Sequence, residues 1–253
     1  MTDVDRSLLI EGLGKGLRVI ECFSDQHPRL TASECGRLAG LTRTAARRYL
    51  VSLVHYGYAD TDGKHYWLLP AILRLGRSYL EAARLPRLAQ PFLQRLSMQT
   101  GETANLSVLD GHDVVYLTRS NSPRVISIGF HPGARIQAHL VSAGFVVLAS
   151  LTDAQLDAWF ADAEFGRFTA ETVVEPDQLR AMVLQARQLG YWLADQYADI
   201  GLRGLAVPLL DRHGRCVAAL SITFQSRAYP GDDSLSKLLP PLQEAAQLLR
   251  GVL

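Results

Sequence analysis

The chain has 253 residues, of which 48% are hydrophobic, and a net charge of +1 at pH 7, which is typical of a globular protein with room for two domains. No run approaches the roughly 18 apolar residues of a membrane span, and the acidic start MTDVDRSLLIEG lacks the basic residues of a signal peptide, so we expect a cytoplasmic protein without a membrane partner. Three widely spaced cysteines, Cys22, Cys35 and Cys216, fit neither a disulfide framework nor a zinc site.

The charge is unevenly distributed along the chain. Residues Lys15 to Arg84 carry 11 Lys and Arg against 6 Asp and Glu, whereas Leu85 to Leu253 carries 14 against 16. A phosphate backbone would attract the first segment and not the second, which favours binding of a polyanion by the N-terminal part.

Residues 1–12 show little periodicity and predict a mobile arm. From Lys15 onward apolar residues recur at helical spacing, which predicts a helix that ends near the turn at Asp25–Arg29. The glycines and lysine of GLGKGL suggest a phosphate-binding loop, but that loop needs Ser or Thr after the lysine and Gly16 stands there. We therefore exclude it.

Two short helices and a turn are predicted next. Thr31 and Glu34 have the spacing of a capping box, and Gly40 is a natural helix end. Thr42 can cap a second helix from Arg43 to about Tyr56. This order indicates a helix-turn-helix.

A hairpin completes the motif. The segments Tyr58–Thr61 and Lys64–Leu68 flank Asp62-Gly63, a pair that favours a two-residue hairpin turn. Helix, turn, helix and hairpin in this order predict a winged helix-turn-helix DNA-binding domain over residues 13–70.

The exposed face at the start of the second helix is basic. Arginine can donate two parallel hydrogen bonds to guanine, and the N-terminal residues of a recognition helix enter the major groove. We predict that the DNA-binding residues are Thr42, Arg43, Thr44, Arg47, Arg48, Lys64 and His65. Among these we assign Arg43, Thr44 and Arg47 to bases, and Arg48, Lys64 and His65 to phosphate. The alternatives are that the arginines form a solvated face and that His65 is an ordinary exposed histidine.

The remaining chain predicts a linker helix over residues 71–86, closed by Pro86, and a larger domain over residues 87–253. The expected helices of that domain are Pro91–Gln99, Ser142–Leu151, a short one opened by a capping box at Thr152, Asp177–Gln188 and Leu235–Leu253. The expected strands are Thr103–Leu109, Val114–Ser120, Val125–Phe130, Gly204–Leu210 and Cys216–Phe224, with an irregular stretch HPGARIQAH between. This pattern favours an α+β domain with a mostly antiparallel sheet.

Several blocks resemble one family in the right order: KGLRVIECF, LAGLTRTAARRYLVSL, GYADTDGKHYWLLPAILRLG, GARIQAHLVSAGFVVLAS and IGLRGLAVPLLDRHGRCVAALSI are similar to the IclR-type transcriptional regulators. The DGKHYWL and LGRSYLEAARLPR segments resemble the branch that controls aromatic-acid catabolism in response to p-hydroxybenzoate or protocatechuate. The resemblance implies a winged-helix domain, a linker helix that helps the chain to dimerise, and a GAF-like domain that binds a small carboxylate.

The resemblance also places the effector-binding positions. They are Ser142, Ala143, Gly144, Asp195, Leu202, Gly204, Ser221 and Thr223. Amides at the helix start from Ser142 could hold an anion, and hydroxyls two residues apart, as at Ser221 and Thr223, project to one face of a strand.

Four positions depart from the family pattern. Gln137 stands in place of proline, Val141 in place of threonine or serine, Phe145 in place of a basic residue, and Tyr197 in place of an acidic residue near Asp199. Phe145 and Tyr197 either line a pocket that accepts an aromatic ring or pack in the core.

The leading hypothesis is a ligand-responsive transcriptional regulator without a cofactor or metal, acting as a homodimer or tetramer on double-stranded DNA at a pseudo-palindromic operator. The effector would be a hydroxyaromatic carboxylate or, alternatively, a small aliphatic acid.

A second hypothesis is an enzyme with Cys216 as nucleophile, His213 or His139 as base, or Asp195 as acid. A third is a winged helix that binds protein. His131 and His139 lack a third metal ligand. The sequence leaves the sign of regulation open.

Overall fold

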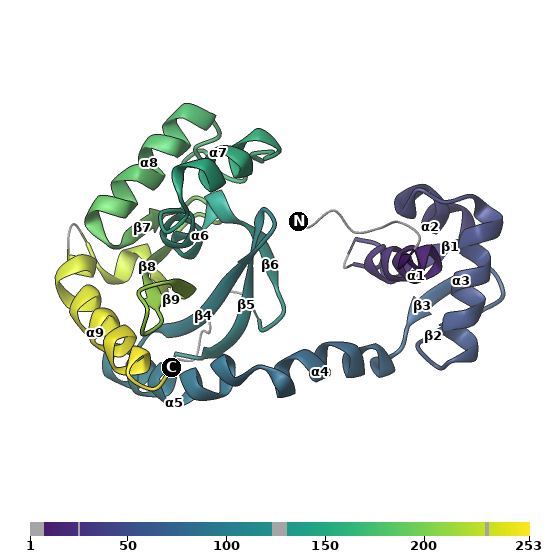
Figure 1. The fold of residues 1–253 in the computed structure, drawn as a ribbon, viewed down its shortest axis with the longest axis horizontal. Helices are drawn as coiled ribbons and strands as arrows, with labels where there is room; N and C mark the ends of the chain where they lie inside the picture. Colours follow the sequence, from purple (N-terminus) through teal and green to yellow (C-terminus); the bar gives the residue numbers. More distant parts are fainter. Residues whose placement is uncertain (1–7, 25, 123–130, 231–232) are drawn as a thin grey trace. The chain divides into compact units, whose positions relative to one another are not determined.

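The computed structural model describes residues 8–24, 26–122, 131–230 and 233–253 and divides the chain into two compact units, residues 1–82 and 83–253. Figure 1 draws the first in purple to blue and the second in teal to yellow. The predicted strand Val125–Phe130 and residues 1–7 of the predicted arm lie outside the described residues. Across the described ranges, no helix combines the length and the apolar character that a membrane crossing requires.

The N-terminal unit is a winged helix-turn-helix. Its elements are α1 (Glu11–Glu21), β1 (Leu30–Thr31), α2 (Ala32–Ala39), α3 (Arg43–His55), β2 (Ala59–Thr61), β3 (His65–Leu68), a 3-10 turn η2 (Pro70–Ile72) and α4 (Leu73–Ala82). The strands form an antiparallel sheet in the order β1-β3-β2. Val19, Leu30, Cys35, Leu50 and Tyr66 form its core. Because α1 begins at Glu11, the last residues of the predicted arm are helical.

Local sequence explains the ends of α2. Thr31 Oγ1 accepts a hydrogen bond from the Glu34 amide, and Glu34 Oε2 accepts one from the Thr31 amide at 2.8 Å, so the predicted capping box is present. Gly40 ends the helix with φ +66°, a left-handed conformation that suits glycine.

The hairpin turn lies one residue further along than predicted. The strands end at Thr61 and resume at His65, and the Asp62 amide donates to the His65 carbonyl, so Gly63 and Lys64 occupy the tip. Gly63 has φ +93° there, a conformation that glycine adopts at little cost.

The C-terminal unit is an α+β domain built on one antiparallel sheet. Its elements are α5 (Arg84–Thr100), β4 (Thr103–Asp110), β5 (Asp113–Ser120), β6 (Arg135–Gln137), η3 (Ala138–Leu140), α6 (Ser142–Leu148), α7 (Asp153–Ala161), α8 (Pro176–Leu189), β7 (Trp192–Asp195), β8 (Leu202–Leu210), β9 (Cys216–Gln225), η4 (Ser226–Ala228) and α9 (Asp233–Arg250). The strand order is β6-β5-β4-β9-β8-β7. The predicted fold class is confirmed.

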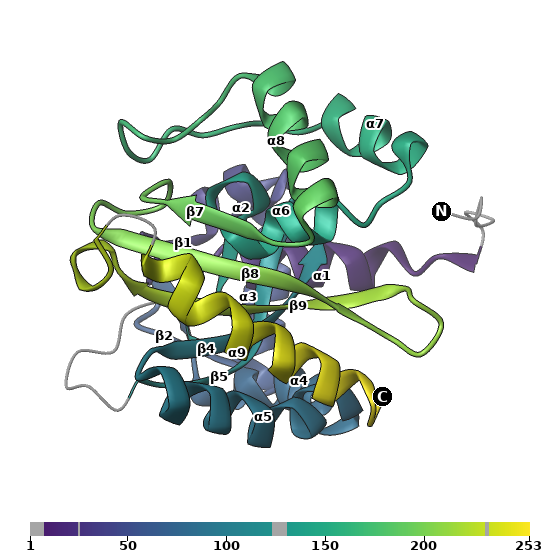
Figure 2. The ribbon, with the colours of Figure 1, turned by 90° about the vertical axis from the view of Figure 1, so that its left-hand side faces the viewer.

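Helices cover both faces of this sheet. Figure 2 looks onto the face covered by α5 and α9, where Leu93, Leu220 and Leu242 are buried in one core. On the other face α6 packs on β8 and β9, and Phe145 and Trp192 are buried in a second core. Residues on this face of β8 and β9 are therefore packed against α6.

Several predicted boundaries were wrong. Pro86 does not close the linker helix: α4 ends at Ala82, and Pro86 lies in the first turn of α5, which continues through Pro91. A proline is tolerated in a first turn because its missing N–H has no helical partner there. The stretch HPGARIQAH contains the short strand β6, and β7 was not predicted.

Candidate functional site

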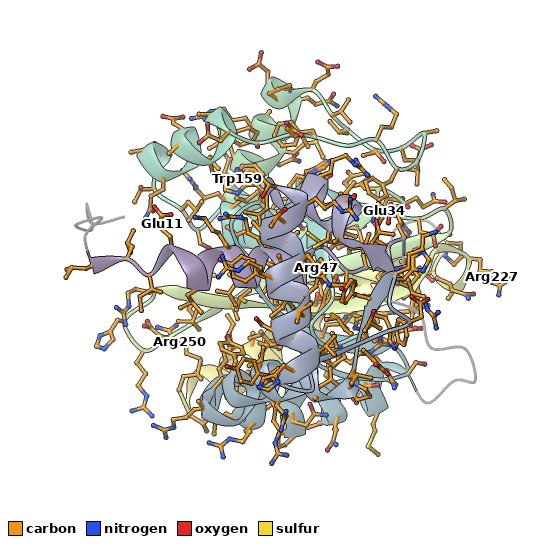
Figure 3. The ribbon with its side chains drawn as sticks, turned by 90° about the vertical axis from the view of Figure 1, so that its right-hand side faces the viewer. Glu11, Glu34, Arg47, Trp159, Arg227 and Arg250 are labelled. Carbon is orange, nitrogen blue, oxygen red and sulfur yellow. The ribbon has the colours of Figure 1, made fainter. Side chains whose placement is uncertain are left out.

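The start of α3 presents an exposed basic surface. Thr42 caps the helix, with its Oγ1 accepting from the Ala45 amide at 3.2 Å. Arg43, Thr44, Arg47 and Arg48 are exposed, and Figure 3 looks onto α3 with Arg47 labelled. No acidic side chain in the described part of the chain pairs with these arginines. Their guanidinium groups are therefore available to an anionic partner.

The hairpin places Lys64 and His65 differently. Lys64 is exposed at the tip, and its amide donates to Asp62 Oδ1 at 2.9 Å. The His65 amide donates to the same oxygen, and the His65 ring contacts Asp62 Oδ2 at 3.2 Å. These hydrogen bonds, the backbone ones first, lower the pKa of Asp62 to about 2. His65 thus has a carboxylate partner within its own turn, whereas Lys64 has a free ammonium among the described contacts.

A pocket opens between α6 and the sheet in the C-terminal unit. The start of α6 forms one wall, β8 and β9 form the floor, and the loop after β7 forms the rim. Its empty volume is about 370 Å³, part of it open to solvent. The lining residues are Tyr116, Leu140, Val141, Ser142, Ala194, Tyr197, Ala198, Leu202, Arg203, Gly204, Ser221 and Thr223. The lining is mostly apolar, with three hydroxyl-bearing residues on α6 and β9.

Five of the eight predicted effector positions line this pocket. They are Ser142, Leu202, Gly204, Ser221 and Thr223. The strand register explains the grouping, because Gly204 lies opposite Thr223 in the antiparallel pair of β8 and β9. Gly204 also permits a close approach, since a Cβ there would lie 2.9 Å from Ser142 Oγ.

The other three predicted positions do not line the pocket. Ala143 is buried in the second core, and Gly144 packs against the Ala138 backbone, where a Cβ would lie 2.0 Å from the carbonyl oxygen. Asp195 forms an ion pair with Arg203 at 2.8 Å from the neighbouring strand. The Asp195 carboxylate therefore has a basic partner inside the protein, and its prediction as an effector contact remains untested.

The departures from the family pattern occupy distinct places. Tyr197 lines the pocket, and burial raises its pKa, with a further contribution from Asp195. Phe145 is 1% exposed and stacks on Trp192 with ring centroids 4.9 Å apart, so it packs in the core. Gln137 Oε1 accepts from the Gly166 amide at 3.2 Å. Only Tyr197 and Val141 among these positions change the pocket lining directly.

Sequence reasoning missed several lining residues. Tyr116 reaches the pocket from β5, and burial raises its pKa. The alternation of β5 could have placed it on the same face as Val114, but not beside α6. Leu140, Ala194 and Ala198 come from short or irregular segments whose apolar residues carry no periodic signal.

The groups considered for an enzyme are not assembled. Cys216 Sγ donates to the Ala218 carbonyl at 3.3 Å, and burial raises its pKa, which opposes formation of a thiolate. His139 Nε2 lies 3.0 Å from the Gly166 carbonyl, and His213 lies exposed in a turn. Within the described ranges no hydrogen bond joins Cys216 to either histidine, and no group of three metal-ligating residues is found.

Comparison with known proteins identifies both units. A model of the IclR helix-turn-helix domain matches residues 12–63, and one of the C-terminal region of the bacterial transcriptional regulator IclR matches residues 77–250. The chain is 36% identical over 248 residues to the p-hydroxybenzoate hydroxylase transcriptional activator of Acinetobacter baylyi, covering 96% of this chain and 92% of the relative. It is 35% identical over 236 residues to the Pca regulon regulatory protein of Pseudomonas putida, covering 93% and 81%.

A solved structure supports the same assignment. An IclR homologue of Microbacterium hydrocarbonoxydans complexed with 4-hydroxybenzoate has a TM-score of 0.76 to this chain at 26% identity, covering 95% of this chain and 98% of the homologue. The two family models leave few residues unmatched, and both relatives are regulators that align with more than nine-tenths of the chain. The chain therefore belongs to the IclR family of DNA-binding bacterial transcriptional regulators.

Proposed function

We propose that this regulator senses a small hydroxybenzoate-type carboxylate in the pocket between α6, β8 and β9. The observation that carries the proposal is the lining: Tyr116 and Tyr197 can contact an aromatic ring, and Ser142, Ser221 and Thr223 can hydrogen-bond its polar substituents. The names of the Acinetobacter relative and of the 4-hydroxybenzoate-bound homologue support this class of ligand. A small aliphatic acid remains the second candidate because the pocket is small.

We propose further that two copies of the chain bind a pseudo-palindromic operator, each with α3 in the major groove. The half-sites would then lie about one helical turn apart, roughly 34 Å. Arg43, Thr44 and Arg47 would contact bases, and Arg48 and Lys64 would contact phosphate. His65 would contact phosphate beside the Asp62 carboxylate, which already pairs with its ring.

A thermal-shift screen tests the ligand class. A ligand that binds only the folded protein raises its unfolding free energy, by about 2.7 kcal/mol at a hundred times its Kd. We expect 4-hydroxybenzoate or protocatechuate to raise the Tm of the C-terminal unit more than pyruvate or glyoxylate does. A larger shift with the aliphatic acids would favour the second candidate, and no shift with any of the four would favour a different effector class.

Replacing two arginines tests the DNA surface. Arg43→Ala with Arg47→Ala should abolish specific binding in a gel-shift assay while leaving effector affinity unchanged. Arg167→Ala with Arg227→Ala removes the same charge from exposed positions of the other unit and serves as the matched control. Wild-type binding should also weaken steeply with salt, because each neutralised phosphate releases counterions. If both double variants lose operator affinity equally, the arginines of α3 contribute only their positive charge and no specific contact.

A further inference from the structure

Asn105 lies on β4, the strand next to β9, on the same face of the sheet as the hydroxyls of Ser221 and Thr223 that line the pocket. It stands in the middle of β4, opposite Ser221 of β9 in the antiparallel register. Its side chain is 0% exposed. Residues opposite one another in such a pair project to the same face, so a buried carboxamide lies beside Ser221 and Thr223 on the face that carries the second core.

The carboxamide makes one hydrogen bond and leaves its oxygen without a partner in the described part of the chain. Asn105 Nδ2 lies 3.1 Å from Thr223 Oγ1, and an amide nitrogen can only donate, so the threonine hydroxyl accepts. Asn105 Oδ1 is buried and has no hydrogen-bond partner in the described part of the chain. Burying an acceptor without a partner opposes folding, and a buried apolar residue would avoid that cost.

The direction of this hydrogen bond determines what Thr223 offers to a ligand. A hydroxyl has one proton and two lone pairs. Because one lone pair of Thr223 Oγ1 is occupied by Asn105, and the repulsion between the two donors turns the proton away from Nδ2, the O–H is left to donate into the pocket that Thr223 lines. Thr223 then recognises an acceptor atom.

We propose that Asn105 is a positioning residue of the effector pocket, which fixes Thr223 as a hydrogen-bond donor and so selects effectors that present an acceptor oxygen at that point. The inference rests on the proposed function of the pocket, and it adds that Thr223 donates a hydrogen bond to the effector. The acceptor is an oxygen of the ligand's carboxylate or the oxygen of its ring hydroxyl. Benzoate and phenol each keep one of the two groups and therefore distinguish them.

Calorimetry with 4-hydroxybenzoate on the full-length protein provides the test. Thr223→Val keeps the shape of the side chain and removes the donor, and we expect about tenfold weaker binding. Asn105→Ala should weaken binding several-fold, and the double variant should bind no more weakly than Thr223→Val alone, because Asn105 acts only through that hydroxyl. Benzoate keeps the carboxylate and phenol keeps the hydroxyl. Asn105→Ala should weaken the binding of only one of them, the one that keeps the oxygen contacted by Thr223.

Asn105→Leu provides a second variant of nearly the same size. Its side chain neither donates nor accepts a hydrogen bond, so it releases the Thr223 hydroxyl as Asn105→Ala does without opening a cavity. We expect binding as weak as in Asn105→Ala, and the double variant with Thr223→Val should bind no more weakly than Thr223→Val alone. Ser107→Ala is the matched control, because Ser107 is equally buried on β4 and makes no contact with Thr223; its affinity should equal the wild-type value.

The outcomes separate the two proposals. If the wild-type protein does not bind 4-hydroxybenzoate or its two fragments, the proposed effector class fails and this inference fails with it. If the wild type binds but the losses from Asn105 and Thr223 variants multiply, or Ser107→Ala weakens binding as much as Asn105→Ala, the pocket stands and the positioning role is wrong. A Tm measured for every variant separates loss of folding from loss of affinity.

Discussion

At the scale of single residues, Gly144 shows how closely α6 must approach the preceding turn. A Cβ at this position would lie 2.0 Å from the Ala138 carbonyl oxygen and 2.6 Å from its carbon, and both atoms belong to the backbone. Gly144→Ala should therefore lower the free energy of unfolding by at least about 3 kcal/mol, the upper end of the usual cost of overpacking. Chemical denaturation measures this loss.

Gly76 provides the control for that substitution. It lies exposed within α4, and no atom would come within 4 Å of an added Cβ. Gly76→Ala should leave stability unchanged or raise it by about 0.5–1 kcal/mol, because alanine loses less backbone entropy in a helix. Equal midpoints for Gly144→Ala and the wild type would show that the helix start can shift without cost.

The ionisation of Asp62 makes the stability of the hairpin depend on pH. The amides of His65 and Lys64 lower its pKa to about 2, well below the ordinary value for aspartate. A lowered folded-state pKa contributes stability that is complete above the unfolded value and is lost as the pH falls through the folded one. We expect the carboxyl carbon of Asp62 to titrate near pH 2 in an NMR experiment. A titration midpoint near pH 4 would mean that the hydrogen bonds from the two amides to the Asp62 carboxylate are not formed in solution.

At the scale of elements, the described part of the chain contains two capping boxes, one in each unit. Thr31 with Glu34 opens α2, and Thr152 with Gln155 opens α7 in the same geometry. Replacing the threonine by alanine should cost about 1 kcal/mol in each case. Hydrogen exchange should show faster exchange in α2 and its neighbours for Thr31→Ala, and in α7 for Thr152→Ala. Loss of protection in both units from one variant would show that they unfold together.

These capping boxes are also where sequence reasoning worked best. Thr31, Gly40 and Thr42 are local signals, because each acts on backbone groups within a few residues, and all three helix ends were predicted correctly. The strands β4, β5, β8 and β9 are long enough for their composition to identify them. The site residues Ser221 and Thr223 followed from the family resemblance combined with strand alternation.

The missed elements depend on partners that are distant in sequence. β7 has four residues and β6 has three, too few for an alternating pattern, and each forms by pairing at an edge of the sheet, with β8 and β5 respectively. The pocket rim at Tyr197 follows β7, so it could not be located without that strand. Asn105 gave no signal at all, because its significance comes from Thr223, which is 118 residues away.

At the scale of the whole molecule, regulation requires that the two units influence each other's ligands. The chain passes from α4 to α5 through Ala83, whose φ of −73° and ψ of 113° lie outside the helical region, so the two helices are separate elements. Any signal along the chain crosses this residue. An effector can change the affinity for DNA only by as much as it distinguishes the states that bind DNA well and poorly.

That coupling must be reciprocal. If the effector changes operator affinity by some factor, the operator changes effector affinity by the same factor, typically 5- to 150-fold or about 1–3 kcal/mol. We expect fluorescence anisotropy on a labelled operator and calorimetry with 4-hydroxybenzoate to give matching factors for the wild type. The variant Arg43→Ala with Arg47→Ala should keep its effector affinity and lose its response to added operator. If the effector leaves operator affinity unchanged and the operator leaves effector affinity unchanged, the two units act independently. The pocket then does not control DNA binding by equilibrium coupling.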